Sequence, residues 1–370
     1  MYSVCFITDP LVTTMGAVRP AILLAREFRR KGHDVTVIAP RFDQAVEKEL
    51  LDEDFLLKDV GPHFSFIPSL PTLDAWGRCL VTQKPVAEIN DSDLAVNTSS
   101  CIISQARAYY AQGPMTRALD DLFPQMPMHY KYPYKIIRSP VRILEGRLVR
   151  RFRDLSELFV ANSVFCGSMY EKWGINVDAI ISPPLDCSLF EPKTTNPTGD
   201  YVLTHFGTFG KEGKFSTVKA IADSGVPIRV FGGTSQMPKP LKKHHSISFV
   251  GKVTDMELAN LYSNALYTLF AFEHEPFGYI PVESMACGTP VLTYGKHGPS
   301  ETVVNMKTGW LSNSDPEMID LAVLLWKNGY DVHMRNECRK RALAFDVKKT
   351  AEVWENALSP RNSSANRFKL

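Results

Sequence analysis

Two glutamates, Glu275 and Glu283, flank a short turn with seven residues between them. The apolar run that ends at Phe270 predicts a buried strand before this turn. Pro281 suits the start of a helix and Gly288 its end, so one carboxylate is expected in the turn and the other in the first helical turn. Helix N-termini attract phosphate, and carboxylates accept hydrogen bonds from sugar hydroxyls. The pattern predicts a ligand with hydroxyls and phosphates; an ordinary turn with solvated acids is the alternative interpretation.

The residues around the two glutamates resemble a known family. Phe277-Gly278 lies within the spacing, and the run MACGTPV follows at 285–291. Together they resemble the retaining family 4 glycosyltransferases, which are glycosyl transferases of group 1. The resemblance implies the α/β architecture called GT-B, in which two Rossmann-like, doubly wound domains are separated by an interdomain cleft. It also implies a retaining transfer of sugar from a nucleotide-diphosphate sugar, with uridine or guanosine as the base, to a hydroxyl acceptor in glycan or glycolipid assembly.

The resemblance also implies roles for the residues of this segment. Glu275 is expected to position the donor sugar as a catalytic residue, and Glu283 is expected to bind the ribose hydroxyls. Further donor contacts are expected, largely through main-chain atoms, from Val253, Phe277, Gly278, Tyr279 and Ile280. Front-face attack is expected, with the leaving phosphate taking the acceptor proton, and no residue is assigned as a nucleophile.

The glycine-rich loop at 207–213 precedes a helix expected from Phe215 to Asp223. Lys211 and Lys214 are candidates for holding the donor diphosphate, because an ammonium stabilises the charge that grows on the leaving group. The family has an arginine where this chain has Thr208. Lys214 is therefore expected to act as the catalytic cation, with Lys211 as its substitute; exposed loop lysines are the alternative.

In the first half of the chain, the resemblance implies that Gly16 and Gln112 are donor-binding residues, and that the Gly16 loop also approaches the acceptor. The strand Tyr2–Thr8 is followed by the loop that contains Gly16, where the family usually has a glycine pair. Ligands of doubly wound domains bind beyond the carboxyl ends of strands. Gln112 stands where the family often has a histidine that points at the donor sugar. It can hydrogen-bond a hydroxyl but cannot accept a proton, and a solvated strand end is an equal alternative.

The chain is expected to form two domains, since 370 residues exceed what one hydrophobic core usually serves. The expected divisions are an acceptor-side domain at 1–190, a linker at 191–199, a nucleotide-sugar-binding domain at 200–345, a helix at 346–360 that returns to the first domain, and a tail at 361–370. Thr254 and Glu257 predict a capping box before a helix from Asp255. Between Arg41 and Asn90 the pattern is weak, apart from a possible strand at Phe64–Ile67.

The stretch 131–153 is rich in basic and aromatic residues, with Glu145 as its one acid. One interpretation is a surface that lies on anionic lipid. The other is a solvated helix face, which is common at this place in the family and which we favour. Nucleic acid is not expected as a partner, because no recognised binding module accompanies the basic residues.

Bulk properties exclude several classes of protein. The net charge of +2 gives no global attraction to nucleic acid, and the chain lacks a run of apolar residues long enough to span a bilayer. Seven scattered cysteines without a CxxC pair fit a reducing cytosol and predict neither a disulfide framework nor a zinc site. We expect a cytoplasmic enzyme, with peripheral membrane contact left open, that requires neither cofactor nor metal. A non-catalytic sugar-nucleotide-binding subunit and a nucleotide-sugar epimerase are the alternatives.

Overall fold

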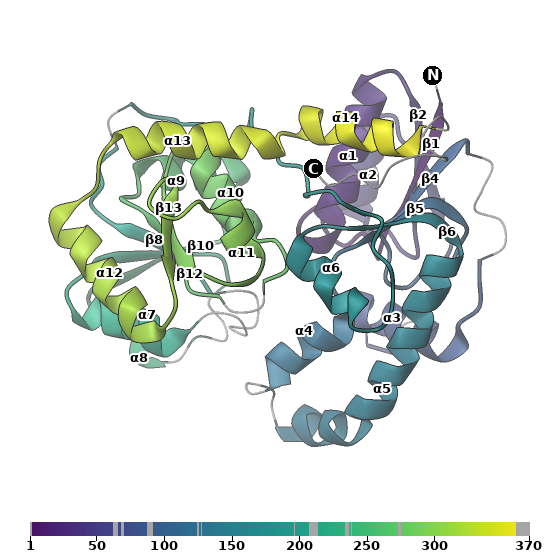
Figure 1. Cartoon of the computed structure of the whole chain (residues 1–370), viewed down its shortest axis with the longest axis horizontal. Coiled ribbons are helices and arrows are strands. Elements are labelled where there is room, and N and C mark those ends of the chain that lie inside the picture. The colour runs from purple at the N-terminus through teal and green to yellow at the C-terminus, as the bar shows by residue number, and fades with distance from the viewer. Residues whose placement is uncertain are drawn as a thin grey trace. The chain divides into compact units, whose positions relative to one another are not determined.

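The protein divides into two compact units in a computed structural model. Unit 1 comprises Met1–Pro184 and Val347–Leu370, and unit 2 comprises Leu185–Asp346. The structure describes residues 2–61, 66–67, 70–86, 92–123, 126, 128–195, 197–206, 214–233, 237, 239–272 and 275–359. Each unit contains one parallel sheet with helices, as the α/β prediction requires (Figure 1).

The sheet of unit 1 has the strand order β3-β2-β1-β4-β5-β6-β7, and every pairing is parallel. Its elements in chain order are β1 Ser3–Ile7, the 3-10 helix η1 Gly16–Val18, α1 Arg19–Arg30, β2 Asp34–Ala39, α2 Gln44–Asp52, β3 Leu56–Asp59, α3 Pro71–Thr82, β4 Leu94–Asn97, β5 Ala106–Ala111, α4 Met115–Leu122, α5 Met128–Asp154, β6 Ser156–Ala161, α6 Val164–Glu171, β7 Ala179–Ile180 and α14 Val347–Leu358.

Successive residues of a strand point to opposite faces of a sheet, and β5 shows how unit 1 uses both faces. Tyr110 belongs to the core formed with α1 and α14, where its ring meets Trp354 at 5.1 Å between centroids. Its neighbours Tyr109 and Ala111 belong to the core formed with α3, α5 and α6. Helices therefore cover both faces, which is the doubly wound arrangement predicted from the sequence.

The weakly patterned part of unit 1 holds elements that the sequence did not reveal. The strand β3 lies at the sheet edge and buries only Leu57 in part, so its residues show no alternation of apolar and polar types. The helix α2 buries only Val46 and Leu50, and the Asp43 side chain caps it by accepting from the Ala45 N–H. The strand expected at Phe64–Ile67 falls mostly outside the described residues.

The sheet of unit 2 has the order β10-β9-β8-β11-β12-β13, again with every pairing parallel. Its elements are β8 Val202–His205, α7 Phe215–Asp223, β9 Ile228–Phe231, α8 Lys239–Lys242, β10 Ile247–Gly251, α9 Asp255–Asn264, β11 Thr268–Phe270, α10 Tyr279–Ala286, β12 Val291–Tyr294, α11 His297–Thr302, β13 Gly309–Ser312, α12 Asp315–Asn328, α13 His333–Ala342 and the 3-10 helix η3 Leu343–Phe345. The capping box of Thr254 and Glu257 is present at the start of α9, as predicted.

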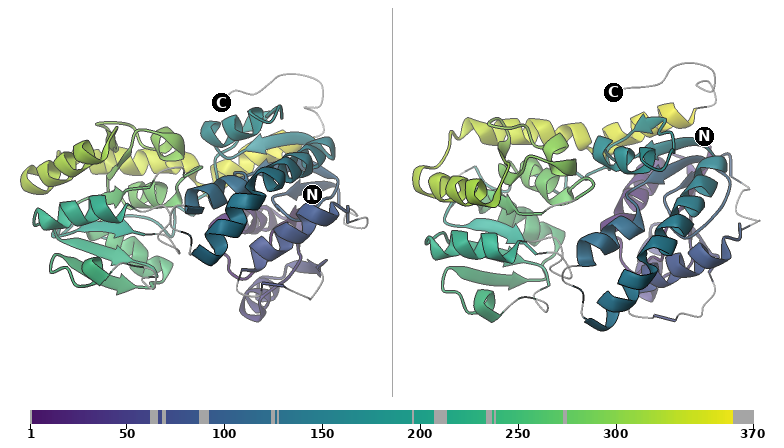
Figure 2. Two further views of the ribbon diagram at one scale, coloured as in Figure 1. Left: turned by 90° about the horizontal axis from the view of Figure 1, so that it is seen from below. Right: turned by 60° about the horizontal axis from the view of Figure 1, so that its bottom comes forward.

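The two faces of this second sheet also carry separate cores. Leu203 and Phe270 pack in a cluster with residues of α9, α10 and α13. Val202 and Leu269, their immediate neighbours in the sequence, pack with residues of α7 and α12 instead. Figure 2 gives two further views of both units.

The boundary between the units differs from the expected one. Unit 1 ends at Pro184, whereas a linker was expected only at 191–199. The intervening residues already belong to unit 2, because Leu185 and Phe190 are buried in its core and the Leu185 N–H donates to the Phe345 carbonyl at 2.8 Å. The polar, proline-containing composition of 191–199 identified a loop, but that loop is attached to unit 2.

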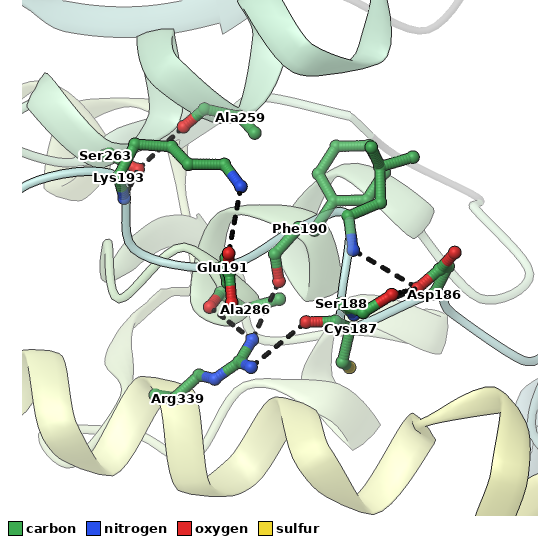
Figure 3. A network of polar contacts seen from close by, with 11 residues as sticks. Asp186, Cys187, Ser188, Phe190, Glu191, Lys193, Ala259, Ser263, Ala286 and Arg339 are labelled. Atoms are coloured by element: carbon green, nitrogen blue, oxygen red, sulfur yellow. Dashed lines mark hydrogen bonds and ion pairs between the residues drawn. The ribbon is translucent and has the colours of Figure 1, made fainter.

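Arg339 of α13 is the residue that holds this segment most directly (Figure 3). Its Nη1 donates to the carbonyls of Phe190 at 2.7 Å and Ala286 at 2.9 Å, and its Nη2 donates to that of Cys187 at 3.0 Å. The Lys193 N–H donates to the Ser263 hydroxyl at 2.9 Å. One guanidinium thereby joins α13, the end of α10 and the chain that leads into the second sheet.

We predict that Arg339→Met destabilises the protein by about 2–3 kcal/mol, because three partly buried carbonyls lose a charged donor. Chemical denaturation measures this free energy of unfolding. The matched control is Lys340→Met on the exposed side of the same helix, which should stay within about 0.5 kcal/mol of the wild type. Equal effects of the two substitutions would contradict the role given to Arg339.

Candidate functional site

The order of strands in unit 2 singles out one place for a ligand. The chain passes from β8 outward through β9 to β10, and then returns to β11 on the other side of β8. Ligands of open parallel sheets bind beyond the carboxyl ends of the strands where the order reverses in this way. In unit 2 those strands are β8 and β11. The turn that contains Glu275 follows β11 directly, so the residues singled out by their spacing lie at the point that the topology favours.

The helix after this turn, α10, begins at Gly278 as its N-cap residue, with φ at +89°. A side chain would be strained in that conformation, which explains a glycine here. The first turn of α10 contains no acidic side chain, and Pro281 lacks an N–H. The N-terminal amides of Tyr279 and Ile280 therefore meet no carboxylate from their own helical turn, and the dipole favours an anion at this end.

Gly298 of α11 fixes the turn from the other side. Its N–H donates to the Glu275 carbonyl at 3.0 Å. A Cβ atom at position 298 would lie 2.2 Å from the Pro276 carbonyl oxygen and 2.5 Å from the Phe277 nitrogen. Only a glycine allows this contact between backbones, so Gly298 and its loop hold the Glu275 turn in place.

Glu283 lies deeper than the sequence analysis expected. Because α10 starts at Tyr279, Glu283 is beyond the first helical turn, and the prediction that placed it there is wrong. Its side chain is 3% exposed and accepts a hydrogen bond from the Tyr262 hydroxyl at 3.0 Å. A buried carboxylate needs such partners, and any further donor that reached it would bind in a setting of low polarity.

His205, the last residue of β8, stands near Glu283 at the same strand edge. Its Nδ1–H donates to the Phe231 carbonyl at 3.0 Å, and its ring stacks on those of Phe231 and Phe272. Burial lowers the pKa of His205 below its ordinary value; the bond to Phe231 and the charge of Glu283 oppose that shift without cancelling it. The imidazole is therefore held neutral beside the carboxylate.

Phe277 and Val253 have structural surroundings that limit what their side chains can do. The Phe277 ring is 4% exposed and packs edge-on against Phe345 and Tyr279. Val253 is half-buried against the same core, in the turn between β10 and α9. Both remain candidates for main-chain contacts, which is the role that the resemblance implied for them.

Lys214 is the N-cap residue of α7. Its Nζ donates to Asp315 Oδ1 at 2.8 Å, and the Tyr294 hydroxyl donates to the same oxygen at 2.6 Å. Partial burial acts to raise the pKa of Asp315, but these hydrogen bonds outweigh it and the pKa lies below its ordinary value. An anionic ligand would have to compete with Asp315 for Lys214. Lys211 and Thr208 lie outside the described residues.

A second ammonium lies against the same aromatic ring. The Nζ atoms of Lys214 and Lys296 are 5.1 Å and 5.2 Å from the centroid of Tyr294. Lys296 comes from the loop after β12, and the sequence analysis did not single it out. Its place between two glycines, Gly295 and Gly298, before a helix was the available signal.

In unit 1 the structure joins Gly16 to Gln112. Gly16 opens the η1 turn with φ at +72°, and the Gln112 Nε2 donates to the carbonyl of Ala17 at 2.8 Å. The sequence analysis expected Gln112 either to bind a hydroxyl of the ligand or to lie in solvent. Instead its side chain connects the end of β5 to the Gly16 loop. The glutamine helps to shape the loop.

Asp9 is a residue that the sequence analysis missed. The strand order of unit 1 reverses between β1 and β4, and Asp9 follows β1 there. Its Oδ1 accepts from the Ser99 hydroxyl at 2.9 Å and the Ser100 N–H at 2.8 Å. Burial raises the pKa of Asp9, while the bonds from Ser99, Cys101 and Ser100 oppose the rise. The carboxylate thus connects the loops after β1 and β4.

Asp9 and His205 share a signal that was available in the sequence. Asp9 follows the first strand of unit 1 and His205 ends the first strand of unit 2, and the first strand lies at the reversal of strand order in a doubly wound sheet.

Among the residues that the structure describes, no group of three or more His, Cys, Asp or Glu side chains could hold a metal ion. Within the same set of residues, none of the helices has the length and apolar character needed to cross a membrane.

We predict that Gly298→Ala lowers the free energy of unfolding by about 1–3 kcal/mol, because the added methyl group overlaps the backbone of 276–277. Thermal or chemical denaturation measures the loss. Gly77 provides the control: it lies within α3, and a Cβ added there would meet no described atom within 4 Å, so Gly77→Ala should be neutral or stabilising by up to about 1 kcal/mol. A Gly298→Ala protein as stable as the wild type would contradict the close contact.

The second half of the chain matches a known family. Residues 196–344 match the model of the glycosyl transferases of group 1. The chain is 24% identical over 243 residues to a GDP-mannose-dependent alpha-(1-6)-phosphatidylinositol dimannoside mannosyltransferase of Mycobacterium tuberculosis, covering 59% of this chain and 63% of that protein. It is 27% identical over 185 residues to a probable sucrose-phosphate synthase of Thermosipho melanesiensis, covering 49% of this chain and 42% of the relative. The chain thus spans less than two thirds of either relative.

A solved structure shares the fold over nearly the whole chain. The crystal structure of Anabaena Alr3699/HepE in complex with UDP and glucose has a TM-score of 0.68 and 17% sequence identity, covering 97% of this chain and all of that one. The likeness confirms the predicted GT-B architecture, and the matched residues confirm the predicted family. Residues 196–344 therefore match the glycosyl transferases of group 1, and the chain as a whole shares the GT-B fold.

Proposed function

We propose that the protein is a retaining glycosyltransferase that moves a sugar from a UDP- or GDP-sugar to a hydroxyl acceptor in glycan or glycolipid assembly. The main support for this proposal is the position of the two glutamates in the sheet of unit 2. Within the family-matched residues, Glu275 and the N-terminus of α10 follow β11, where the strand order reverses, and Glu283 lies on the same helix. The two acids and the anion-attracting end between them suit the hydroxyls and phosphates of a sugar nucleotide.

In this proposal Glu283 binds the ribose hydroxyls. Its burial and its bond from Tyr262 hold the carboxylate in one orientation, so a ribose hydroxyl would find an acceptor that is already in place. Glu275 and the backbone at 277–280 orient the sugar ring, and the amides at the start of α10 receive the phosphates. Val253, in the turn after β10, contacts the base through its main chain.

Stabilising the departing diphosphate is the task of the cations at this edge. Lys214 and Lys296 both lie against the Tyr294 ring, and two ammonium groups would offset more of the phosphate charge than one. When no diphosphate is bound, Asp315 accepts the hydrogen bond from Lys214. Lys211 keeps the role of substitute cation that the sequence analysis gave it, and Thr208 of the same loop is proposed as a further donor contact. The proposed mechanism has the leaving phosphate take the acceptor proton, so it requires no metal and no cofactor.

The acceptor and the compartment rest on less direct support. One relative acts, by its name, on a phosphatidylinositol dimannoside, which supports a glycolipid acceptor. Gly16 and Gln112 of unit 1 stay candidates for donor contacts, and the Gly16 loop is also the candidate for an acceptor contact. All seven cysteines are described and carry free thiols. Free thiols support a reducing compartment such as the cytoplasm.

A non-catalytic sugar-nucleotide-binding subunit is the second candidate, and the Lys214–Asp315 ion pair is the observation that favours it. An ammonium already neutralised by a carboxylate contributes less to a leaving group. Hydrolysis of a sugar nucleotide above the background rate, or transfer to an acceptor, would exclude this candidate. Conversion of the free sugar nucleotide into its epimer, without an acceptor, would instead indicate the epimerase alternative.

The experiment that tests the function first is a thermal-shift screen against a panel of UDP- and GDP-sugars. A ligand present at one hundred times its dissociation constant adds about 2.7 kcal/mol of stability, so the correct donor should raise the melting temperature clearly. Transfer of label from that donor to glycolipid and glycan acceptors follows. A panel without any stabilising sugar nucleotide would contradict the proposal.

We predict that Glu283→Gln weakens binding of that donor by about 10- to 100-fold, because a charge-assisted hydrogen bond to the ribose becomes a neutral one. The glutamine can still accept from Tyr262, so the fold should persist. Isothermal titration measures the affinity. Tyr262→Phe is the control, since it removes the hydroxyl that donates to Glu283 but leaves the carboxylate available to the sugar nucleotide. This variant should weaken binding of the sugar nucleotide less than Glu283→Gln does.

We predict that Glu275→Ala abolishes transfer while leaving the fold intact, because the side chain is only half-buried and its backbone carbonyl keeps the bond from Gly298. Circular dichroism and the melting temperature check the fold, and the label-transfer assay checks activity. Near-normal turnover in this variant would remove Glu275 from the mechanism.

A further inference from the structure

The long helix α5 of unit 1 turns one face to its own core. Its buried side chains include Tyr134, Leu148, Val149 and Phe152, which recur at the spacing of an α-helix. The start of the helix lies at the periphery of unit 1 in Figure 1 and in the right-hand view of Figure 2. A surface helix of this kind should present polar side chains on the side opposite its core.

The outward side of α5 is apolar instead. Tyr132, Ile136 and Ile143 are 58%, 78% and 58% exposed. Their spacing of four and then seven residues places them along one stripe of the helix, roughly opposite the buried face. Met128, Tyr130 and Ile137 on the same helix are also exposed, at 59%, 64% and 48%. Exposed apolar side chains gathered on one element mark an interaction surface more often than isolated ones do.

Most of the charges around this stripe are positive. Lys135, Arg147 and Arg150 are exposed on α5. The only acid between residues 128 and 153 is Glu145, which is 2% exposed and accepts from the backbone N–H groups of Met115 and Thr116. The sequence alone could not show that Glu145 faces inward, which leaves Asp154, the exposed last residue of α5, as the one acid of this helix at its surface.

Acids on the neighbouring helix α4 do not neutralise the stripe. Asp120 is paired with Arg138 at 3.3 Å and with Arg142, and it also accepts from the Tyr134 hydroxyl at 3.1 Å. Asp121 pairs with Arg117 of its own helix at 3.4 Å. Asp120 therefore faces basic residues of α5 and Asp121 one of α4, so the charges of both acids are offset by basic partners.

We propose that the outward face of α5 lies on an anionic membrane surface. Tyr132, Ile136 and Ile143 enter the boundary between headgroups and acyl chains, and the flanking basic side chains contact lipid phosphates. An amphipathic helix with a basic polar border and an aromatic and aliphatic centre binds bilayers in this way. The proposal is independent of the sugar-transfer function, since it needs neither donor nor acceptor.

Other occupants fit the surface less well. A second copy of the chain would bring one positive stripe against another, and like charges oppose such an interface. A nucleic acid would use the basic residues but would leave the exposed isoleucines in water, since base-stacking platforms are aromatic. A lipid surface is complementary to both the charge and the apolar centre.

Co-sedimentation of the full chain with vesicles tests the proposal, without any sugar nucleotide present. The protein should pellet with vesicles of phosphatidylcholine and phosphatidylglycerol at low salt, and much less with phosphatidylcholine alone or at high salt. Replacing Tyr132, Ile136 and Ile143 together by serine should lower the partition coefficient for the anionic vesicles by about tenfold or more, because the apolar contribution is lost.

The matched control replaces three exposed apolar residues of unit 2, Met256, Leu324 and Val332, by serine; this variant should bind vesicles like the wild type. The double variant Lys135→Gln/Arg147→Gln should lose most of its dependence on anionic lipid. Binding by the α5 serine variant that equals the wild type, or failure of the wild type to pellet with anionic vesicles, would overturn the proposal. So would a dimer in lipid-free solution that the α5 serine variant alone dissociates.

Discussion

The candidate site depends on one close contact between two loops of unit 2. Gly298 approaches the backbone at 276–277 so nearly that no side chain fits, and its N–H donates to the Glu275 carbonyl. This contact joins the turn after β11 to the start of α11. The turn then leads into α10 through Gly278, whose positive φ orients the first amides of the helix. A catalytic carboxylate on a mobile turn would be poorly oriented, and the glycine contact provides the rigidity.

The two glutamates differ in how far their side chains are exposed to solvent. Glu275 is partly exposed at the turn, where a ligand can reach it. Glu283 is almost completely buried between α10 and α9, beside a neutral His205, and its partner Tyr262 satisfies part of its hydrogen-bonding capacity. A carboxylate in such a setting needs hydrogen-bond partners, and the hydroxyl of a ligand would be a suitable one. The geometry accordingly suits Glu275 to the reacting sugar and Glu283 to a fixed part of the donor.

Much of the fold could be predicted from the sequence, because strongly periodic segments such as Phe215–Asp223 and the capped helix at Asp255 carry their own local signals. The edge strand β3 could not, since it buries almost nothing. The unit boundary was misplaced because composition reports polarity, whereas Leu185 and Phe190 decide which core the segment joins. For the site, spacing located Glu275 and Glu283, but the helix begins at Tyr279 and not at Pro281, so Glu283 lies beyond the first helical turn in which it was expected. The Lys214–Asp315 pair joins residues far apart in the sequence, and no local pattern reveals it.

In both units the strand order of the sheet reverses beside the first strand, but the side chains at that place differ. In unit 1, Asp9 at the reversal of strand order connects neighbouring loops and stays internal. In unit 2 the equivalent edge presents Glu275, the start of α10 and two lysines. The central claim is that a sugar nucleotide binds at this edge of unit 2, and a crystal structure of the protein with the UDP- or GDP-sugar that stabilises it most tests that claim directly. The account predicts ribose hydroxyls within hydrogen-bonding distance of Glu283 and phosphates at the first amides of α10. A sugar nucleotide bound elsewhere, with neither glutamate in contact, would contradict it.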